Sequence, residues 1–150
     1  MNKVVSDDPA RRALHKMNEA CGISGISWLQ KHLLSGYELR LKTPWILDAD
    51  VTVKPLYDHQ DGAEIGYNPQ KPGRPSHTYH TDMIANLRLI LDVEVQAGNQ
   101  SHSNDSLPGL IALLKRLPAD GKPQFVRGDI GYGTDKFMDQ MEALEQPYLS

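Results

Sequence analysis

An alternating stretch near residue 50 constrains the fold more than any other part of the sequence. From Trp45 to Lys54, apolar side chains at positions 47, 49, 51 and 53 alternate with polar or charged ones. Successive side chains of a β-strand point to opposite faces of the sheet, so this pattern predicts a strand with one buried and one polar face. The strand therefore belongs to a sheet, and the elements that follow it decide the type of sheet.

The rest of the chain predicts a mixed α/β sheet. A long loop rich in glycine and proline, from 57 to 76, follows the first strand. After it we expect a short strand within the loop at 63–67, strands at 79–87, 89–96 and 124–127, helices at about 106–117 and 134–145, a glycine-rich turn at 128–133, and the start of a strand at 148–149. Three antiparallel strands followed by alternating helix and strand place strand 124–127 parallel to its neighbour, through a right-handed crossover.

Residues 1–42 are predicted to form a separate helical segment in front of this sheet. Apolar residues at helical spacing indicate two short helices, and Gly22 and Gly25 lie between them. The segment carries more basic than acidic residues, whereas the remainder is acidic and the whole chain has a net charge of −3. A basic arm before an acidic core fits a protein that touches a polyanion at one end and gathers cations at the other. A chance distribution of charge explains the same asymmetry equally well.

Composition excludes several classes of protein. The single cysteine, Cys21, rules out an internal disulfide and any zinc site built from several cysteines. The sequence has no apolar run near the ~18 residues that cross a bilayer, and its first residues lack the apolar core of a signal peptide. We therefore expect a cytosolic protein without a membrane partner.

Two aspartates occupy positions where a sheet of this type collects ligands. Asp50 lies on the polar face of the first strand, and Asp129 follows strand 124–127 inside the glycine-rich turn. If the two strands are neighbours, both carboxylates can reach one divalent cation, for which hard oxygen ligands suit Mg²⁺ or Mn²⁺. Phosphoryl transfer uses such carboxylate-bound metals. Taken alone, each aspartate is better explained by a local role such as capping a helix.

Three stretches of the chain resemble the DDE transposases of bacterial insertion sequences. They are WILDADVTVKPLY at 45–57, GYNPQKPGRPS at 66–76 (preceded by Gly62-Ala63) and RGDIGYG at 127–133. The resemblance runs from about Trp45 to the end of the chain. It implies a partial RNase H-like fold, in which a mixed sheet is flanked by helices. It also implies an enzyme that cuts and rejoins DNA with the help of Mg²⁺ or Mn²⁺.

The resemblance also implies site residues. The family's first catalytic aspartate falls on Asp50, with Thr52 two residues later, and its second falls on Asp129. Both would be catalytic metal ligands. The family's third acidic residue, a glutamate on a later helix, has no counterpart before Ser150, and Asp58 and Ile130 stand where the family has other residues. We therefore expect 43–150 to be an incomplete catalytic domain in a chain truncated at both ends.

Partners follow from the same resemblance. DNA is the expected substrate, homo-oligomers are expected of the full-length protein, and the expected location is the bacterial cytoplasm, associated with the nucleoid. Lys71, Arg74 and His77 in and beside the proline-rich loop are candidate phosphate contacts, although a solvated loop is an equal alternative. Tyrosines 57, 67 and 79 are candidates for stacking on exposed bases or for ordinary packing. His77 and His80 form a weaker candidate for a metal pair.

Two alternatives remain open at this stage. A metal-dependent nuclease of the same fold would cut DNA without strand transfer, and a non-catalytic remnant would retain contacts only. Asp48 competes with Asp50 for the catalytic role because both lie on the same face of the strand. Two carboxylates one pleat apart repel each other, so we expect one to serve the ion and the other to be solvated or paired with Arg127 or Lys54. The resemblance assigns the ion to Asp50, because Thr52 follows it at the family's spacing.

Overall fold

A computed structural model describes residues 39–100 and 102–150, together with 9, 12, 28, 30–32 and 35–37. The chain divides into two compact units, Met1–Gly36 and Tyr37–Ser150. The described residues of the first unit are helical. Most of the predicted helical segment, with Cys21, lies outside the described residues, and the boundary after residue 42 stays a prediction.

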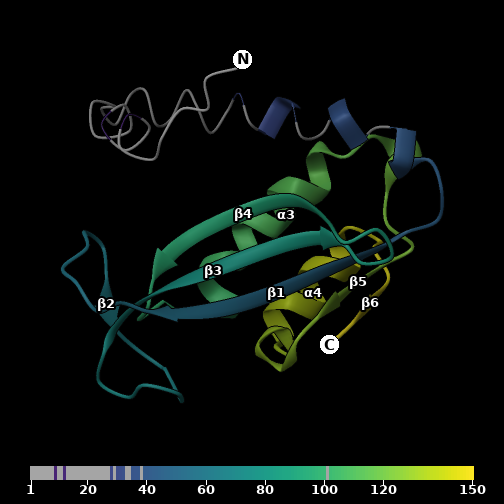
Figure 1. Ribbon diagram of the computed structural model, residues 1–150. Coiled ribbons are helices and arrows are strands. Elements are labelled where there is room, and N and C mark those ends of the chain that lie inside the picture. Colours follow the sequence, from purple (N-terminus) through teal and green to yellow (C-terminus); the bar gives the residue numbers. More distant parts are fainter. Residues whose placement is uncertain are drawn as a thin grey trace. The chain divides into compact units, whose positions relative to one another are not determined.

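The second unit is built on a six-stranded mixed sheet (Figure 1). Its strand order is β2-β3-β1-β5-β6, and β4 pairs with β3. β1 runs antiparallel to β3 and parallel to β5, while β5 is parallel to β6. The strands are β1 (Ile46–Pro55), β2 (Glu64–Ile65), β3 (Pro75–Ile84), β4 (Leu89–Ala97), β5 (Phe125–Gly128) and β6 (Tyr148–Leu149).

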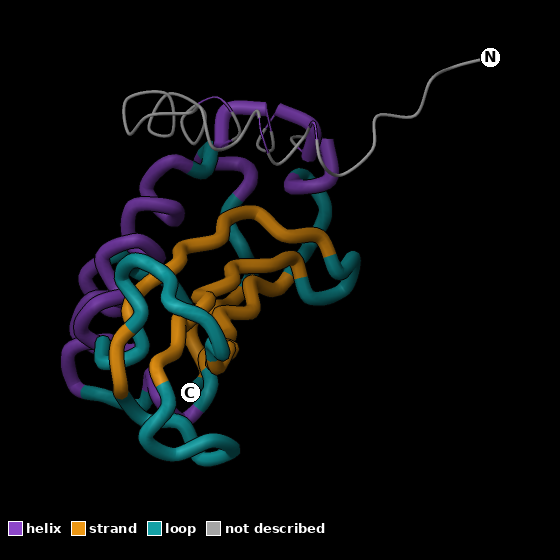
Figure 2. The backbone as a smooth tube through the Cα atoms, turned by 60° about the vertical axis from the view of Figure 1, so that its left-hand side comes forward, coloured by secondary structure: helices purple, strands orange, loops and turns teal. Residues whose placement is uncertain are grey.

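Two α-helices lie on the same side of the sheet (Figure 2). Helix α3 (Leu107–Arg116) has proline in its first turn, where no backbone N–H is needed, and helix α4 (Asp135–Ala143) begins at Thr134, whose hydroxyl accepts a hydrogen bond from Phe137 N. Shorter helical turns are His102–Ser106, Ala119–Gly121 and Ile130–Tyr132.

The hydrophobic core lies between the sheet and these helices. Strand residues Leu47 and Val126 are fully buried, and so are the helix residues Leu113, Phe137 and Met141. The Phe137 ring lies 5.6 Å from the rings of both Tyr132 and Tyr148, so it joins α4 to two other elements. Each large apolar side chain buried in this way stabilises the fold by about 1.5–3 kcal/mol.

The predicted order of strands and helices is confirmed, and the bounds of two strands are corrected. β3 begins at Pro75, not at residue 79, and it ends at Ile84, so the predicted residues up to 87 belong to a turn. The early part of β3 escapes prediction because Ser76 and Thr78 are polar yet buried. The strand predicted at 63–67 is only Glu64–Ile65.

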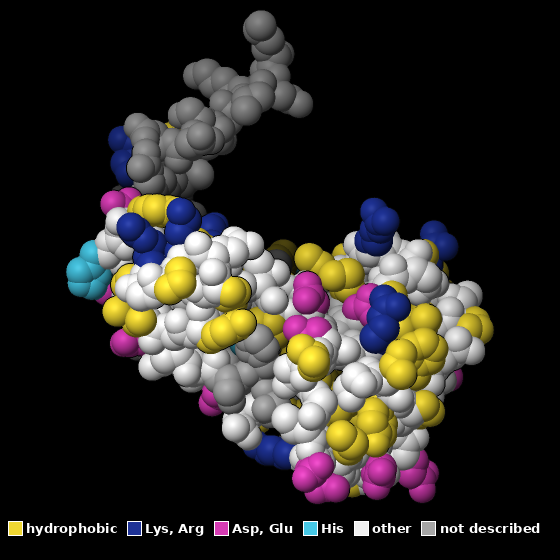
Figure 3. All heavy atoms as spheres, turned by 90° about the horizontal axis from the view of Figure 1, so that it is seen from below, with side chains coloured by type: hydrophobic (Ala, Val, Ile, Leu, Met, Phe, Trp, Pro, Cys, Tyr) yellow, Lys and Arg dark blue, Asp and Glu magenta, His cyan; other side chains and the backbone are white. Residues whose placement is uncertain are grey.

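Charge on the surface is mixed in sign. The chain has 16 basic and 19 acidic residues. On the face drawn in Figure 3, Lys and Arg side chains stand among acidic and apolar ones and do not form one broad basic field. Any attraction of this face to a polyanion is therefore local.

An acidic cluster lies beneath the sheet, against α3. Asp82 on β3 lines a cavity of about 20 Å³ together with Asp92 and Glu94 of β4, His80 and Tyr132. Burial, and then the charges of Asp92 and Glu94, raise the pKa of Asp82 to about 7, although Arg116 opposes the shift. Arg116 pairs with Asp92 at 2.8 Å. Asp82 is therefore protonated in the folded protein at pH values where it would be ionised in the unfolded chain.

This shift predicts that Asp82 makes the folded protein less stable as the pH rises. Between the ordinary value of 3.8 and about 7, the folded state binds the extra proton. The free energy of unfolding should therefore fall by up to about 1.4 kcal/mol per pH unit in that window. Urea unfolding at about pH 5 and about pH 8 should show a smaller decline for Asp82→Asn than for the wild type. The exposed Asp139→Asn should behave as wild type, and identical slopes for both variants would contradict this account.

Candidate active site

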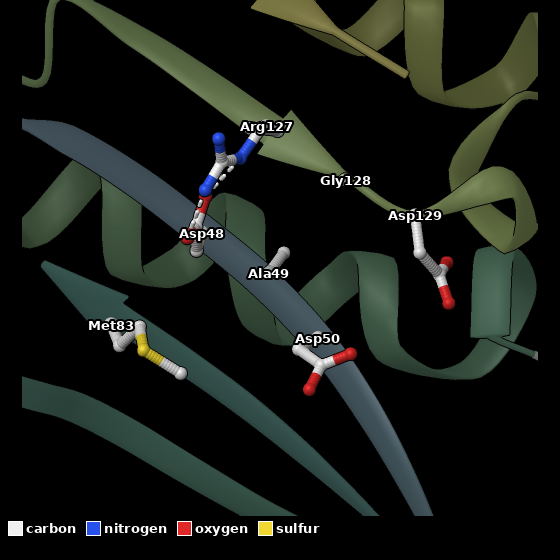
Figure 4. A pocket seen from close by; sticks show the side chains of 7 residues that line it. All are labelled: Asp48, Ala49, Asp50, Met83, Arg127, Gly128 and Asp129. Carbon is white, nitrogen blue, oxygen red and sulfur yellow. Dashed lines mark hydrogen bonds and ion pairs between the residues drawn. The ribbon is translucent and has the colours of Figure 1, made fainter. Parts of the chain in front are cut away.

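A pocket of about 270 Å³ opens where β1 and β5 lie side by side (Figure 4). The two strands pair in parallel, with Asp48 opposite Arg127 and Ala49 opposite Gly128. Asp50 and Asp129 are the next residues along the two strands, so they lie side by side just beyond the last pair of the β1–β5 ladder. The pocket is lined by Asp48, Ala49, Asp50, Met83, Arg127, Gly128 and Asp129.

Asp50 and Asp129 both extend into this pocket (Figure 4). Both residues are exposed, so each carboxylate can exchange water for another ligand. Asp129 also caps a helical turn, which is the local role that the sequence offered as the alternative to a catalytic one. Its Oδ1 accepts a hydrogen bond from Gly131 N at 2.9 Å and caps the turn Ile130–Tyr132. That bond fixes the orientation of the carboxylate and leaves Oδ2 for a ligand.

Asp48 lines the same pocket but is held by Arg127. The guanidinium donates through Nε and Nη2 to the two carboxylate oxygens, each at 2.6 Å. This hydrogen bonding, together with the charge of Asp48, raises the pKa of Arg127 above its ordinary value. The pairing with Arg127 was one of the two expected for Asp48. Lys54, the other expected partner, lies 5.9 Å from the ring of Tyr79.

Gly128 and Tyr132 form a tightly packed wall that the sequence pattern did not single out. A Cβ at Gly128 would lie 2.8 Å from Cβ of Tyr132, so only glycine fits between the two site residues on either side of it. Burial raises the pKa of Tyr132 to about 12, with smaller contributions from Asp82, Asp129 and Asp50. Its hydroxyl forms a 3.1 Å hydrogen bond with Ser106. Tyr132 therefore stays protonated. The spacing of glycines in RGDIGYG was the available signal for this wall.

The predicted DNA contacts do not line this pocket. Lys71 and Arg74 lie in the loop between β2 and β3, and His77 lies on β3. The ring of His77 bonds to the Asp61 carbonyl at 3.2 Å, whereas His80 is buried and bonds to Thr78 Oγ1 at 3.3 Å. The two histidines thus have separate surroundings. Within the described residues, no three His, Cys, Asp or Glu side chains are placed to hold a metal ion together.

The donor set of the pocket suits one hydrated divalent cation. Asp50 and Asp129 supply hard carboxylate oxygens, and Mg²⁺ commonly binds through one or two carboxylates while it keeps several waters. Asp48 is neutralised by Arg127, so it does not add to the negative charge available to an ion. The residues present therefore fit an octahedral oxygen-loving ion such as Mg²⁺ or Mn²⁺.

Fold and site together define a mixed α/β domain that brings two exposed aspartates to the end of the paired segment of two neighbouring parallel strands. The family model described as the transposase DDE domain matches residues 41–150. The chain therefore belongs to the DDE transposase family, as its sequence motifs suggested. The predicted fold class, a mixed α/β sheet flanked by helices, is confirmed by this sheet and its helices.

Solved structures with a similar chain course include integrases and transposases. The HTLV-2 integrase catalytic core domain in complex with magnesium has 14% identity and a TM-score of 0.46, over 71% of this chain and 60% of that one. The Mos1 transposase catalytic domain with raltegravir and Mg has 15% identity and a TM-score of 0.48, over 91% and 64%. The Mos1 strand transfer complex has 16% identity and a TM-score of 0.47, over 81% and 38%.

The chain thus spans less than two thirds of each of these proteins. No curated protein matches its sequence. Among the residues that the structure describes, no helix has both the length and the apolar character needed to span a bilayer.

The site predicts different effects for three aspartate variants. Asp50→Asn and Asp129→Asn should each weaken binding of Mn²⁺ about tenfold or more, since each removes one of two charged ligands. Asn at 129 keeps an oxygen that can cap the turn, so the fold should survive. Asp48→Asn should change affinity much less, because Arg127 already occupies that carboxylate. Calorimetric titration with Mn²⁺ measures all three, and equal losses at 48 and 50 would make Asp48 a ligand.

Proposed function

We propose that this chain is part of a bacterial insertion-sequence transposase that cleaves DNA phosphodiesters and transfers the freed strand, with Mg²⁺ or Mn²⁺ bound by Asp50 and Asp129. The observation that carries the proposal is the convergence of these two carboxylates in one pocket of a DDE transposase domain. The family supports DNA as substrate and a homo-oligomer as the working form. A DNA substrate in a bacterium would place the protein in the cytoplasm, in association with the nucleoid.

Each residue of the pocket has a role in this proposal. Asp50 and Asp129 hold the ion, which when bound activates the attacking oxygen and stabilises the leaving one. Arg127 binds both carboxylate oxygens of Asp48, so Asp48 does not compete with Asp50 for the ion. Tyr132, protonated and buried, supports the turn that carries Asp129. Lys71, Arg74 and His77 contact phosphates of the bound DNA outside the pocket.

The charge of the site limits what it does unaided. Two free carboxylates balance one divalent ion, whereas in-line displacement at two metals needs a larger negative charge around them. Among the described residues, no further acidic side chain lines the pocket besides Asp48, which Arg127 neutralises. A third carboxylate from outside this set therefore completes the site in the working protein.

Cleavage of supercoiled plasmid with Mn²⁺ tests the proposal. A protein that holds this domain together with a third carboxylate should nick the plasmid, Asp50→Asn and Asp129→Asn should abolish nicking, and Asp48→Asn should retain most of it. Joined products should accompany the nicks, which separates a transposase from a nuclease. Nicking that no aspartate variant affects would overturn the assignment. Robust cleavage by the 150-residue chain alone would show that two carboxylates suffice.

A further inference from the structure

Tyr57 and Arg74 form a stacked pair at the base of the long loop, away from the acidic pocket. The β1–β3 ladder ends with Pro55 opposite Ser76, and Leu56 N donates to Pro75 O at 2.9 Å. Tyr57 and Arg74 follow in the same register. The guanidinium carbon of Arg74 lies 4.5 Å from the centre of the Tyr57 ring. The end of the sheet therefore fixes this pair, which we call the Tyr57–Arg74 shelf.

The shelf borders a pocket of about 380 Å³, and hydrogen bonds fix the turn beside it. Leu56 is buried beneath it, whereas 68% of the Tyr57 side chain is exposed. The adjoining turn is closed by a 3.2 Å hydrogen bond from Ala63 N to Gln60 O, with Gly62 at a φ of 74°. His77 holds the same turn through the Asp61 carbonyl. The pocket is lined by Leu56, Tyr57, Asp58, His59, Gln60, Ala63, Arg74 and Pro75.

The chemistry of this pocket fits an unpaired nucleotide. An exposed aromatic ring stacks on bases, and an adjacent guanidinium stacks as well and binds phosphate. Bases inside a duplex are already stacked, so they cannot use the ring. Asp58 lines the pocket together with Arg74, and Asp61 lies in the adjoining turn, so charge alone would hold a duplex poorly. Stacking is therefore the main attraction that this pocket offers to DNA.

We propose that the Tyr57–Arg74 shelf binds an unpaired nucleotide of single-stranded DNA. The base stacks on the free face of Tyr57, and Arg74 contacts the neighbouring phosphate. Pro55 lies five residues beyond Asp50 on β1, which is about 16 Å at the rise of a strand. The shelf thus lies within reach of a strand whose phosphate occupies the acidic pocket. The choice of DNA and this last connection rest on the proposed function, whereas the stacking of an unpaired nucleotide does not.

Binding of a labelled oligothymidylate of about 12 nucleotides, followed by fluorescence anisotropy in EDTA, tests the shelf. Tyr57→Ala should weaken binding about tenfold, and Tyr57→Phe, which keeps the ring, should retain it. Arg74→Ala should weaken binding and lower the salt dependence by about 0.7 in log–log slope. Tyr67→Ala is the matched control because Tyr67 is also an exposed tyrosine close by in the sequence but does not line the pocket.

Equal effects of Tyr57→Ala and Tyr67→Ala, or no effect of either, would overturn the proposal. Binding of a blunt duplex as tight as that of the single strand would also overturn it, and so would tighter binding of an oligouridylate. Tyr57 is exposed, so thermal melting should show that the variants fold as the wild type does. Because EDTA removes divalent ions, a failure of the metal chemistry leaves this experiment unaffected, and a failure of the shelf leaves the nicking experiment unaffected.

Discussion

The pairing of β1 on both of its edges is the constraint on which the rest of the structure depends. β3 binds one edge in antiparallel register and β5 binds the other in parallel register. Leu47 and Ala49 are thereby buried in the core, while Asp48 and Asp50 lie on the opposite face. A slip of one residue would send the aspartates into the core and the apolar residues into water. The register of a single strand therefore fixes the core and the pocket together.

Four aspartates near this strand lie in four different surroundings. Asp48 is neutralised by a two-point contact with Arg127, and Asp129 accepts a backbone N–H. Asp50 is exposed to water. Asp82 lies under the sheet, where burial raises its pKa. Placing neutral or compensated carboxylates around two free ones concentrates the available negative charge at the place where Asp50 and Asp129 meet.

Sequence reasoning succeeded where one pattern had one structural meaning. The alternation of apolar and polar residues around Asp50 indicates only a strand with one buried face. The pairing of β1 with β5 follows from the order of elements. It failed at Ser76 and Thr78, since buried polar side chains look like loop residues. The glycine spacing was the only signal for the Gly128–Tyr132 contact, which depends on the curvature of the turn at Ile130–Tyr132. Asp82 escaped for a similar reason, since a register shift at Asp82/Met83 sets which β4 side chains face it.

The order in which the strands pair during folding also determines when the pocket forms. Only residues 56–74, with the short strand β2, separate β1 from β3 along the chain, but Asp48 and Arg127 are 79 residues apart in the sequence. Contacts between distant segments form only after the intervening chain is organised, because closing a longer loop costs more entropy. A ligand that needs both Asp50 and Asp129 therefore finds its site only in chains that have completed the crossover to β5. Its capture would mark one of the last steps of folding.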